Sequence, residues 1–480
     1  MSDDPQGPDP SPAFAVWKVS FVAIFGAFLT QLDGVIVNVS LTTMAQELES
    51  DLPTIQWVTS GYLLALALAL PLTGWLVDRF GVRFVYLGSF MAFTVTSMLC
   101  GLAWSAPSLI AFRVLQGMSG GLLTPMAQMM LARVAGNRLP HVMGYAAMPV
   151  LLAPMLGPVI AGYILQHASW PILFYVNVPF GALAIVTAAI VLPLDDRKLS
   201  RTRFDYFGFA LLSPGLALFL YGIDALASPE GAGALLLSLV MLGAFILVAR
   251  RKGRESLINL DLFRAKSFAT SVKIQFLANG TSFAGQMLLP IYLIRACGQS
   301  PAAAGVMLAP IGLGMACFFP FLGRLTDRFG IRHVSATGAL ISALATVPVI
   351  AMAYTGFNSR VFVIALFCRG AGMSMIGVPS VSCAYSAVDR EDVPMASTTL
   401  NVVQRLGGPA LTTICASFLG WRLGASPQAI TSHAFGQALM LLGSMQLILW
   451  AIAMRLPLRL PPNREESGDK ALPATLENVG

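Results

Sequence analysis

Fourteen long apolar runs dominate this sequence, and each is about as long as a lipid bilayer is thick. A spanning helix needs about 20 apolar residues, and backbone polar groups inside lipid are satisfied only in helices or closed barrels. Only 11% of the residues are charged, against about 25% in soluble domains. We therefore expect an all-α polytopic membrane protein with 14 transmembrane helices. The runs are Val16–Val39, Trp57–Val77, Arg83–Trp104, Pro107–Leu131, Val142–Gln166, Ile172–Leu192, Tyr206–Leu226, Gly233–Ala249, Phe268–Ile294, Ala302–Leu322, Val334–Tyr354, Val361–Ala384, Ala396–Trp421 and Phe435–Met454.

Positive charges are concentrated on one side of this predicted bundle. If the N-terminus is cytoplasmic, 23 of the 30 Lys and Arg residues fall in cytoplasmic segments, three in outer loops and four within the runs. This bias predicts a multi-pass protein of the cell inner (plasma) membrane, with both termini in the cytoplasm. It also accounts for the net charge of +7, so we expect the lipid bilayer as a partner and no nucleic acid.

A twelve-residue segment occurs twice. Gly74–Val85 and Gly323–Val334 agree at eight positions, and each follows the second run of a presumed half. Repeated halves are typical of secondary transporters, whose substrate site lies at the interface between the halves. The predicted division is a disordered cytoplasmic N-terminus over 1–15, an N-terminal six-helix half over 16–192, two inserted helices with flanking cytoplasmic loops over 193–266, a C-terminal six-helix half over 267–456 and a cytoplasmic tail over 457–480.

The repeated segment is a candidate cytoplasmic gate. Its glycines allow a tight turn, a carboxylate can face the positive N-terminus of a neighbouring helix, and its arginines hold the turn on the inner side. The alternative is that the segment fixes topology alone. The gate candidates are Gly74, Asp78, Arg79, Gly81, Arg83, Gly323, Asp327, Arg328, Gly330 and Arg332.

Five further motifs accompany the repeat. They are Leu32–Val39 (LDGVIVNV), Arg113–Gly117 (RVLQG), Ala153–Gly162 (APMLGPVIAG), Trp170–Gly181 (WPILFYVNVPFG) and Leu260–Arg264 (LDLFR). With the repeated loop, they resemble the major facilitator superfamily and, within it, the fourteen-span drug:proton antiporter family. The resemblance implies the major facilitator fold, with two six-helix halves plus two extra helices between them. It also implies an antiporter motif that includes Pro154, Gly157, Pro158 and Gly162.

Asp33 is the leading site candidate because it is an acid deep inside the first apolar run. Such an acid costs about 2.5–3.5 kcal/mol on insertion scales, and it usually marks a functional site. Arg113 is its natural electrostatic counterpart. The alternatives are a capped or paired structural aspartate and an arginine that ties helix ends together. For Arg113, proton relay is what the resemblance implies.

Polar residues on one face of an apolar helix usually face protein or a water-filled cavity. Gln116 shares the face of Arg113, and similar stripes recur in the ninth and thirteenth runs. Substrate contact and interhelical hydrogen bonding both remain open for them. The cavity candidates are Thr30, Gln116, Gln275, Asn279, Ser282, Gln286, Asn401 and Arg405.

Several functions are excluded or disfavoured. The cysteines and histidines show no metal-ligand spacing, no phosphate-binding loop is present, and no catalytic set is evident. We therefore expect no metal, no cofactor and no enzymatic activity.

The preferred function is proton-coupled antiport that exports small amphiphilic compounds by alternating access. The second half has no acid within its runs, which favours monocationic or neutral substrates. A periplasmic adaptor is a candidate partner if the cell is Gram-negative. The alternatives are an exporter of one dedicated metabolite or lipid, a proton symporter that imports its substrate, and a non-transporting sensor.

Overall fold

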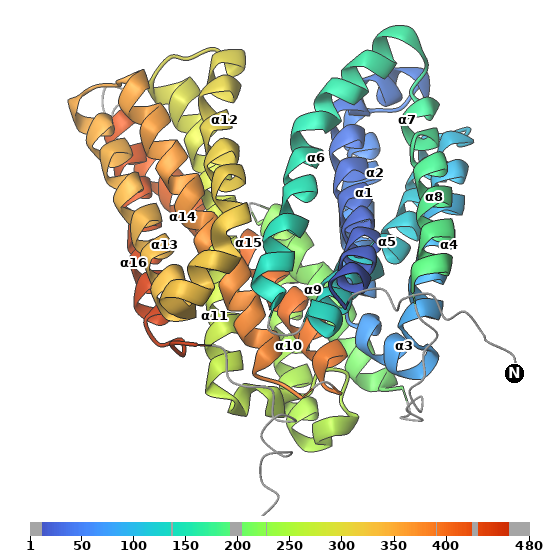
Figure 1. Ribbon diagram of the computed structural model, residues 1–480. Coiled ribbons are helices and arrows are strands. Elements are labelled where there is room, and N and C mark those ends of the chain that lie inside the picture. The colour runs from blue at the N-terminus through green and yellow to red at the C-terminus, as the bar shows by residue number, and fades with distance from the viewer. Residues whose placement is uncertain are drawn as a thin grey trace, which may run out of the picture.

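The computed structural model describes residues 12–135, 138–192, 204–226, 228–389, 391–424 and 431–459, and this part of the chain is helical without a strand (Figure 1). The helices are α1 (Pro12–Glu47), α2 (Leu52–Ala69), α3 (Leu72–Phe80), α4 (Val82–Gly101), α5 (Ala106–Ala135), α6 (Leu139–His167), α7 (Pro171–Tyr175), α8 (Asn177–Val191), α9 (Tyr206–Asp224), α10 (Pro229–Lys252), η2 (Gly253–Glu255), η3 (Leu260–Arg264), α11 (Lys266–Ile291), η4 (Tyr292–Ala296), α12 (Pro301–Phe318), η5 (Phe319–Phe321), α13 (Leu322–Thr355), α14 (Ser359–Ser386), α15 (Val393–Gly424) and α16 (Thr431–Ala453).

Each of the fourteen apolar runs coincides with a helix or a pair of successive helices. By length and composition, eight helices of the described residues are apolar enough to span a membrane, or nine if α2 and α3, which meet at 54°, form one span. The all-helical membrane fold is therefore confirmed, while the count of fourteen spans stays a prediction. The predicted disorder at both ends concerns mainly residues 1–11 and 460–480, which lie outside the described residues.

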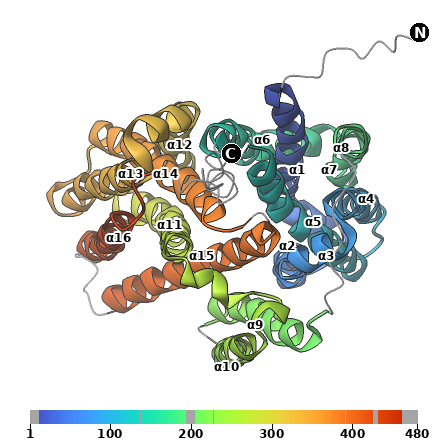
Figure 2. The same ribbon diagram turned by 60° about the horizontal axis from the view of Figure 1, so that its bottom comes forward.

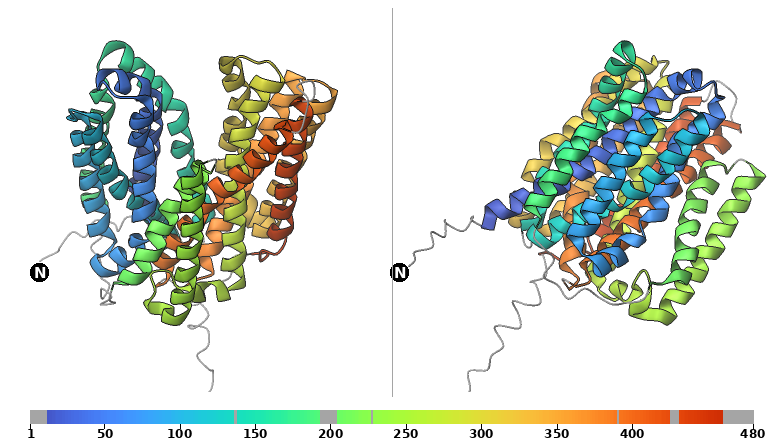
Figure 3. Two further views of the ribbon diagram at one scale, coloured as in Figure 1. Left: turned by 180° about the vertical axis from the view of Figure 1, so that it is seen from behind. Right: turned by 90° about the vertical axis from the view of Figure 1, so that its right-hand side faces the viewer.

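The helices form two bundles that meet at one end and diverge toward the other (Figures 1 and 3). One bundle contains α1 to α8 and the other α11 to α16. We call the end at which they meet the basic face. The elements that lie there, among them α3 and the C-terminal end of α10 (Figure 1), and the turns of the repeated segment carry many arginines and lysines: Arg79, Arg83, Arg250, Arg251, Lys252, Arg328, Arg332 and, after α16, Arg455.

Hydrogen bonds between the bundles involve residues near the basic face. Ser397 Oγ of α15 donates to the Pro125 carbonyl of α5 (2.8 Å), and Asn401 Nδ2 donates to Gln128 Oε1 (3.0 Å). Tyr385 of α14 also donates to Gln128 Oε1, at 3.2 Å. Among the described residues, the hydrogen bonds between the two halves therefore lie near one face, the basic face.

The inserted hairpin of α9 and α10 packs beside the seam between α2 and α15 (Figure 2). Leu212 and Leu216 of α9 share an apolar cluster with Leu66 of α2 and Val402 of α15. The hairpin is tied at the basic face by buried Asp205, which accepts hydrogen bonds from Gly208 N, Lys252 Nζ and Leu257 N. Helix α9 thus contacts both halves, while α10 is the more exposed helix of the pair.

The repeated segment folds the same way in both halves. Gly81 and Gly330 have φ/ψ of 86°/157° and 81°/158°, a region that favours glycine. The arginine two residues later then bonds the C-terminal end of the last helix of its own half. Arg83 donates to Ala189 O and Leu192 O (both 2.7 Å), and Arg332 donates to Leu456 O (2.6 Å). The sequence repeat is therefore a structural repeat as well.

Candidate functional site

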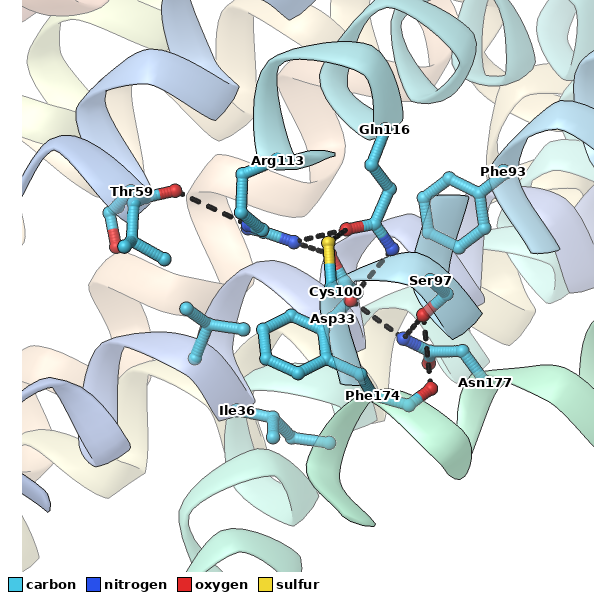
Figure 4. A network of polar contacts seen from close by, with 12 residues as sticks. Asp33, Ile36, Thr59, Phe93, Ser97, Cys100, Arg113, Gln116, Phe174 and Asn177 are labelled. Atoms are coloured by element: carbon cyan, nitrogen blue, oxygen red, sulfur yellow. Dashed lines mark hydrogen bonds and ion pairs between the residues drawn. The ribbon is translucent and has the colours of Figure 1, made fainter. Parts of the chain in front are cut away.

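Asp33 of α1 forms a buried ion pair with Arg113 of α5. Arg113 Nη1 lies 2.7 Å from Asp33 Oδ2, and the two side chains are 0% and 1% exposed (Figure 4). The charges must be paired at this depth because an isolated ion in such surroundings costs several kcal/mol. The two residues that the sequence singles out as acid and counter-charge are thus direct partners.

Two amides complete the shell of the carboxylate (Figure 4). Asp33 Oδ1 accepts hydrogen bonds from Asn177 Nδ2 at 2.6 Å and from Gln116 Nε2 at 3.3 Å. Asn177 Nδ2 also donates to Ser97 Oγ, which donates to the Phe174 carbonyl. Among the described residues, all donors to Asp33 come from its own half, so the acid lies inside the N-terminal bundle and away from the joint with the other half.

Arg113 is held by more than its carboxylate. Nε donates to Val58 O (3.2 Å) and Nη1 also donates to Gln116 Oε1 (2.7 Å). Its guanidinium carbon lies 4.0 Å from the centre of the Tyr62 ring, a cation–π geometry. A guanidinium fixed on several sides can keep its position when the acid changes its protonation state.

Sequence reasoning assigned no role to Asn177, Ser97 or Tyr62. Asn177 lies in the Trp170–Gly181 motif, and a polar residue among aromatic and apolar neighbours is a signal that could have marked it as a site residue. The other two are a serine and a tyrosine of ordinary apolar helices, and only the packing of α4 and α2 brings them to the pair.

The Ala153–Gly162 motif packs α6 against α1. The space that a Cβ would need at Gly157 lies 2.6 Å from Val35 Cγ1, and Ala153 and Ala161 are fully buried in one cluster with residues of α1. Around Gly162 that space is open. Small residues therefore let α6 approach the helix that carries Asp33. Pro154 and Pro158 are also within α6.

Thr30 and the polar stripe of α11 have different surroundings. The Thr30 hydroxyl donates to carbonyls of its own helix, and its side chain is buried. Gln275 donates to Gly377 O and Ser380 Oγ of α14 and accepts from Gln404 of α15, so here it joins three helices.

Further along α11 the stripe becomes accessible. Gln286 is exposed and donates to Ser282 Oγ at 3.3 Å, and both Ser282 and Asn279 are partly exposed. These three residues are available to a solute in this state, whereas Gln275 is engaged by protein.

The thirteenth run contributes one joining residue and one charge. Asn401 is buried in the joint between the halves. Arg405, one helical turn farther from the basic face, is partly exposed. Within the described part of the chain it makes no hydrogen bond or ion pair.

The gate candidates lie around the joint. In the first copy, a Cβ at Gly74 would lie 3.2 Å from Thr398 Oγ1 of α15; Asp78 is half-buried and Arg79 exposed. In the second copy, Gly323 packs against the His141 ring of α6, and Asp327 lies 3.5 Å from His141 Nε2. Arg328 is exposed. Both copies therefore contact the opposite half.

The C-terminal half contains a related network without an acid. Buried Arg369 of α14 donates to Thr346 Oγ1 (3.2 Å) and to Thr281 O (3.1 Å). Thr346 in turn donates to Gln446 Oε1 of α16 (2.8 Å). An arginine, a hydroxyl and an amide thus recur, while a backbone carbonyl of α11 stands where the N-terminal half uses a carboxylate.

Two helical bundles with a repeated loop and buried charges are the architecture typical of secondary transporters built from duplicated halves. The sequence matches the profile of the Major Facilitator Superfamily over residues 23–410, with a second match over 272–477. The chain belongs to the Major Facilitator Superfamily, a superfamily of transporters.

Relatives and solved structures agree with this membership. The chain is 33% identical over 417 residues to the "Multidrug resistance protein B homolog" of Mycobacterium tuberculosis (strain ATCC 25618 / H37Rv), which covers 85% of this chain and 77% of the relative. It is 30% identical over 347 residues to the "Putative multidrug resistance protein MdtD" of Escherichia coli O9:H4 (strain HS), covering 71% and 73%. The proton:xylose symporter XylE has the same fold, with a TM-score of 0.62, 15% identity and coverage of 95% and 99%.

Proposed function

We propose that this protein is a proton-coupled antiporter that exports small amphiphilic compounds from the cytoplasm. The observation that carries the proposal is the ion pair of Asp33 and Arg113, sealed inside the N-terminal half at 2.7 Å. A buried acid of this kind can hold a proton during part of the cycle, and its fixed counter-charge makes release of that proton favourable.

Orientation follows from the charges of the loops. We assign the basic face to the cytoplasm, because positively charged loops remain on that side. The halves are joined at the basic face and diverge at the other, so the described state is the one that faces outward (Figure 1). Loops of both sequence copies contact the opposite half here and would separate when the protein turns inward.

In the coupling step, a proton and the Arg113 guanidinium compete for the Asp33 carboxylate. When a proton from outside binds the carboxylate, the acid loses its charge and the attraction to Arg113 weakens. Gln116 and Asn177 donate to the carboxylate in the described state and would have to reorient around a protonated acid. This rearrangement changes the packing inside the N-terminal half. Proton binding can therefore shift the equilibrium between the outward-facing and inward-facing states.

The names of the relatives support a drug as cargo. Both carry "multidrug resistance" in their names, and the accessible polar residues of α11 suit a solute that is partly apolar. Export of one dedicated metabolite or lipid is the second candidate, since the same frame would serve it. Transport of a panel of dyes and drugs by vesicles that contain the protein separates the two candidates, because a multidrug exporter moves many of them and a dedicated exporter does not.

The direct test uses purified protein in proteoliposomes with a pH-sensitive dye inside. Substrate added on the side of the basic face should cross to the other side, and protons should move in the opposite direction. Substrate movement that ignores an imposed pH gradient would contradict antiport, and movement of proton and substrate in the same direction would indicate symport.

A further inference from the structure

Arg405 is a charge near the middle of a membrane-spanning helix. It lies 12 residues after the start of α15, or about 18 Å along the helix axis. Ser397 and Asn401, which precede it by two turns and one turn, bond the opposite half. Arg405 is on the same side of α15, directly above this joint, and the described residues give it no hydrogen bond or ion pair. Its guanidinium is therefore available to a ligand.

Apolar side chains from three helices line a crevice beside Arg405. Arg405 lines a narrow crevice together with Ala67, Leu70, Leu216, Leu220, Val402 and Leu406, which come from α2, α9 and α15. A charged group in apolar surroundings binds an opposite charge more strongly than it does in water. The crevice is too narrow for the body of an amphiphile, so only a charged head group would contact Arg405 here.

Tyr62 of α2 is a second polar side chain of the apolar cluster that adjoins this crevice. Its hydroxyl is buried and donates no hydrogen bond among the described residues. Tyr62 belongs to the same apolar cluster as Val402, three residues before Arg405, and its hydroxyl is close enough to Arg405 for an electrostatic interaction. Two donors without partners, one from each half, thus lie near each other.

The sign of the surrounding charge is positive. Helices α11, α12, α14, α15 and α16 contain no aspartate or glutamate, and Asp327 of α13 lies at the basic face. The same half buries Arg369 with neutral partners only. On the other side, Asp33 is already engaged by three donors. A cationic head group would find no free carboxylate at this level of the described structure.

We propose that Arg405 and the Tyr62 hydroxyl bind the negatively charged head group of an amphiphilic substrate, such as a carboxylate, sulfonate or phosphate. The proposal deepens the antiport function and rests on it for the identity of the ligand as cargo. It replaces the expectation of monocationic or neutral substrates, because the acid-free C-terminal half also contains guanidinium groups that repel cations.

The position also links cargo to proton. The centre of the Tyr62 ring lies 4.0 Å from the Arg113 guanidinium carbon, and the charges of Arg113 and Arg405 both act on the Tyr62 hydroxyl. An anion at Arg405 would adjoin the ring that covers the partner of Asp33. Binding of the head group and protonation of Asp33 can therefore influence each other over a short path.

Binding is measured with two fluorescent probes of equal chain length on the wild-type protein in nanodiscs. One is dansyl-aminoundecanoate, a carboxylate, and the other is its trimethylammonium analogue. We expect the carboxylate to bind at least about tenfold more tightly, the worth of one charge-assisted contact. Equal binding of the two probes, or tighter binding of the cation, would overturn the proposal.

Variants locate the site. Arg405→Gln should weaken carboxylate binding about tenfold or more, and Tyr62→Phe several-fold, while Lys273→Gln removes another charge of the C-terminal half and should change little. Arg405→Lys keeps the charge but loses the planar guanidinium, so it should retain the preference for the carboxylate probe at reduced affinity. This variant provides the test if Arg405→Gln does not fold. Unchanged binding in both Arg405 variants would place the anion elsewhere.

Failure of this proposal is distinguishable from failure of the antiport function. If the cationic probe is exported with proton uptake and Arg405→Gln leaves carboxylate binding intact, the anion site is wrong and antiport stands. If the carboxylate binds at Arg405 but its movement in proteoliposomes carries no proton, the site stands and antiport is wrong.

Discussion

Replacing Asp33 by asparagine should abolish proton coupling at a measurable cost in stability. Loss of one partner of a buried ion pair costs about 3–5 kcal/mol, because the other charge stays buried. Asparagine keeps one oxygen to accept from Arg113. The free Oδ1 of Asn177, buried without a partner among the described residues, can rotate to accept from the new amide. We therefore expect the lower end, about 3 kcal/mol, a large share of a typical unfolding free energy of about 5–15 kcal/mol.

The assay combines thermal unfolding with substrate-induced proton movement in proteoliposomes. Asp33→Asn should melt at a lower temperature, bind substrate and move no protons above background. The double variant Asp33→Asn/Arg113→Gln removes both charges, so it should be at least as stable as the single variant and equally uncoupled. This comparison separates loss of the proton site from loss of the fold.

Asp205→Asn is the matched control. It removes a second buried carboxylate that is paired with a cation, Lys252, outside the two halves. We expect reduced stability of the hairpin and unchanged proton movement per substrate. Normal coupling in Asp33→Asn, or equal loss of coupling in Asp205→Asn, would refute the reasoning.

Three further predictions concern the repeated loops. Arg83→Ala removes two hydrogen bonds to carbonyls at the C-terminal end of α8, and it should slow efflux turnover while leaving substrate affinity unchanged. Poorer affinity at an unchanged rate in transport kinetics would reject this prediction. Gly330→Ala places a side chain at φ 81° and against a backbone oxygen, so it should lower the melting temperature by more than Gly305→Ala, a helical glycine with open space around it. His141→Gln should weaken the joint by less than about 1 kcal/mol because the pair with Asp327 is partly exposed. The measurement is a double-mutant cycle of His141 and Asp327, read from distances between spin labels on the two halves. Effects of the two substitutions that simply add would contradict the pairing.

The sequence predicts the fold well because the strongest signals are physical and local. Apolar length marks each helix, and the duplicated Gly74–Val85 and Gly323–Val334 segments mark the halves. The positive φ values of Gly81 and Gly330 explain why the duplication can be recognised in the sequence, since a tight turn of this kind tolerates few alternatives to glycine. The sequence predicts fourteen spans, whereas eight helices of the described residues, or nine if α2 and α3 form one span, are long and apolar enough to cross a membrane.

The candidate site was predictable only in part. An acid and an arginine within apolar runs could be picked out singly, and the structure pairs them. Periodicity gives the face on which Gln275 and Asn401 lie, yet it does not give the neighbour, and both bond other helices here. Tyr62 carried no signal because its importance comes from two arginines that lie 51 and 343 positions away in the chain.

The most direct test of the central claim follows the proton on Asp33 itself. Infrared difference spectra of the purified protein can record the carbonyl stretch of a protonated carboxyl group as substrate is added. We predict that substrate removes a protonated-carboxyl band and releases a proton to the buffer, and that Asp33→Asn lacks both signals. A band that substrate leaves unchanged, or one that persists in Asp33→Asn together with normal proton release, would contradict a transport cycle built on this acid.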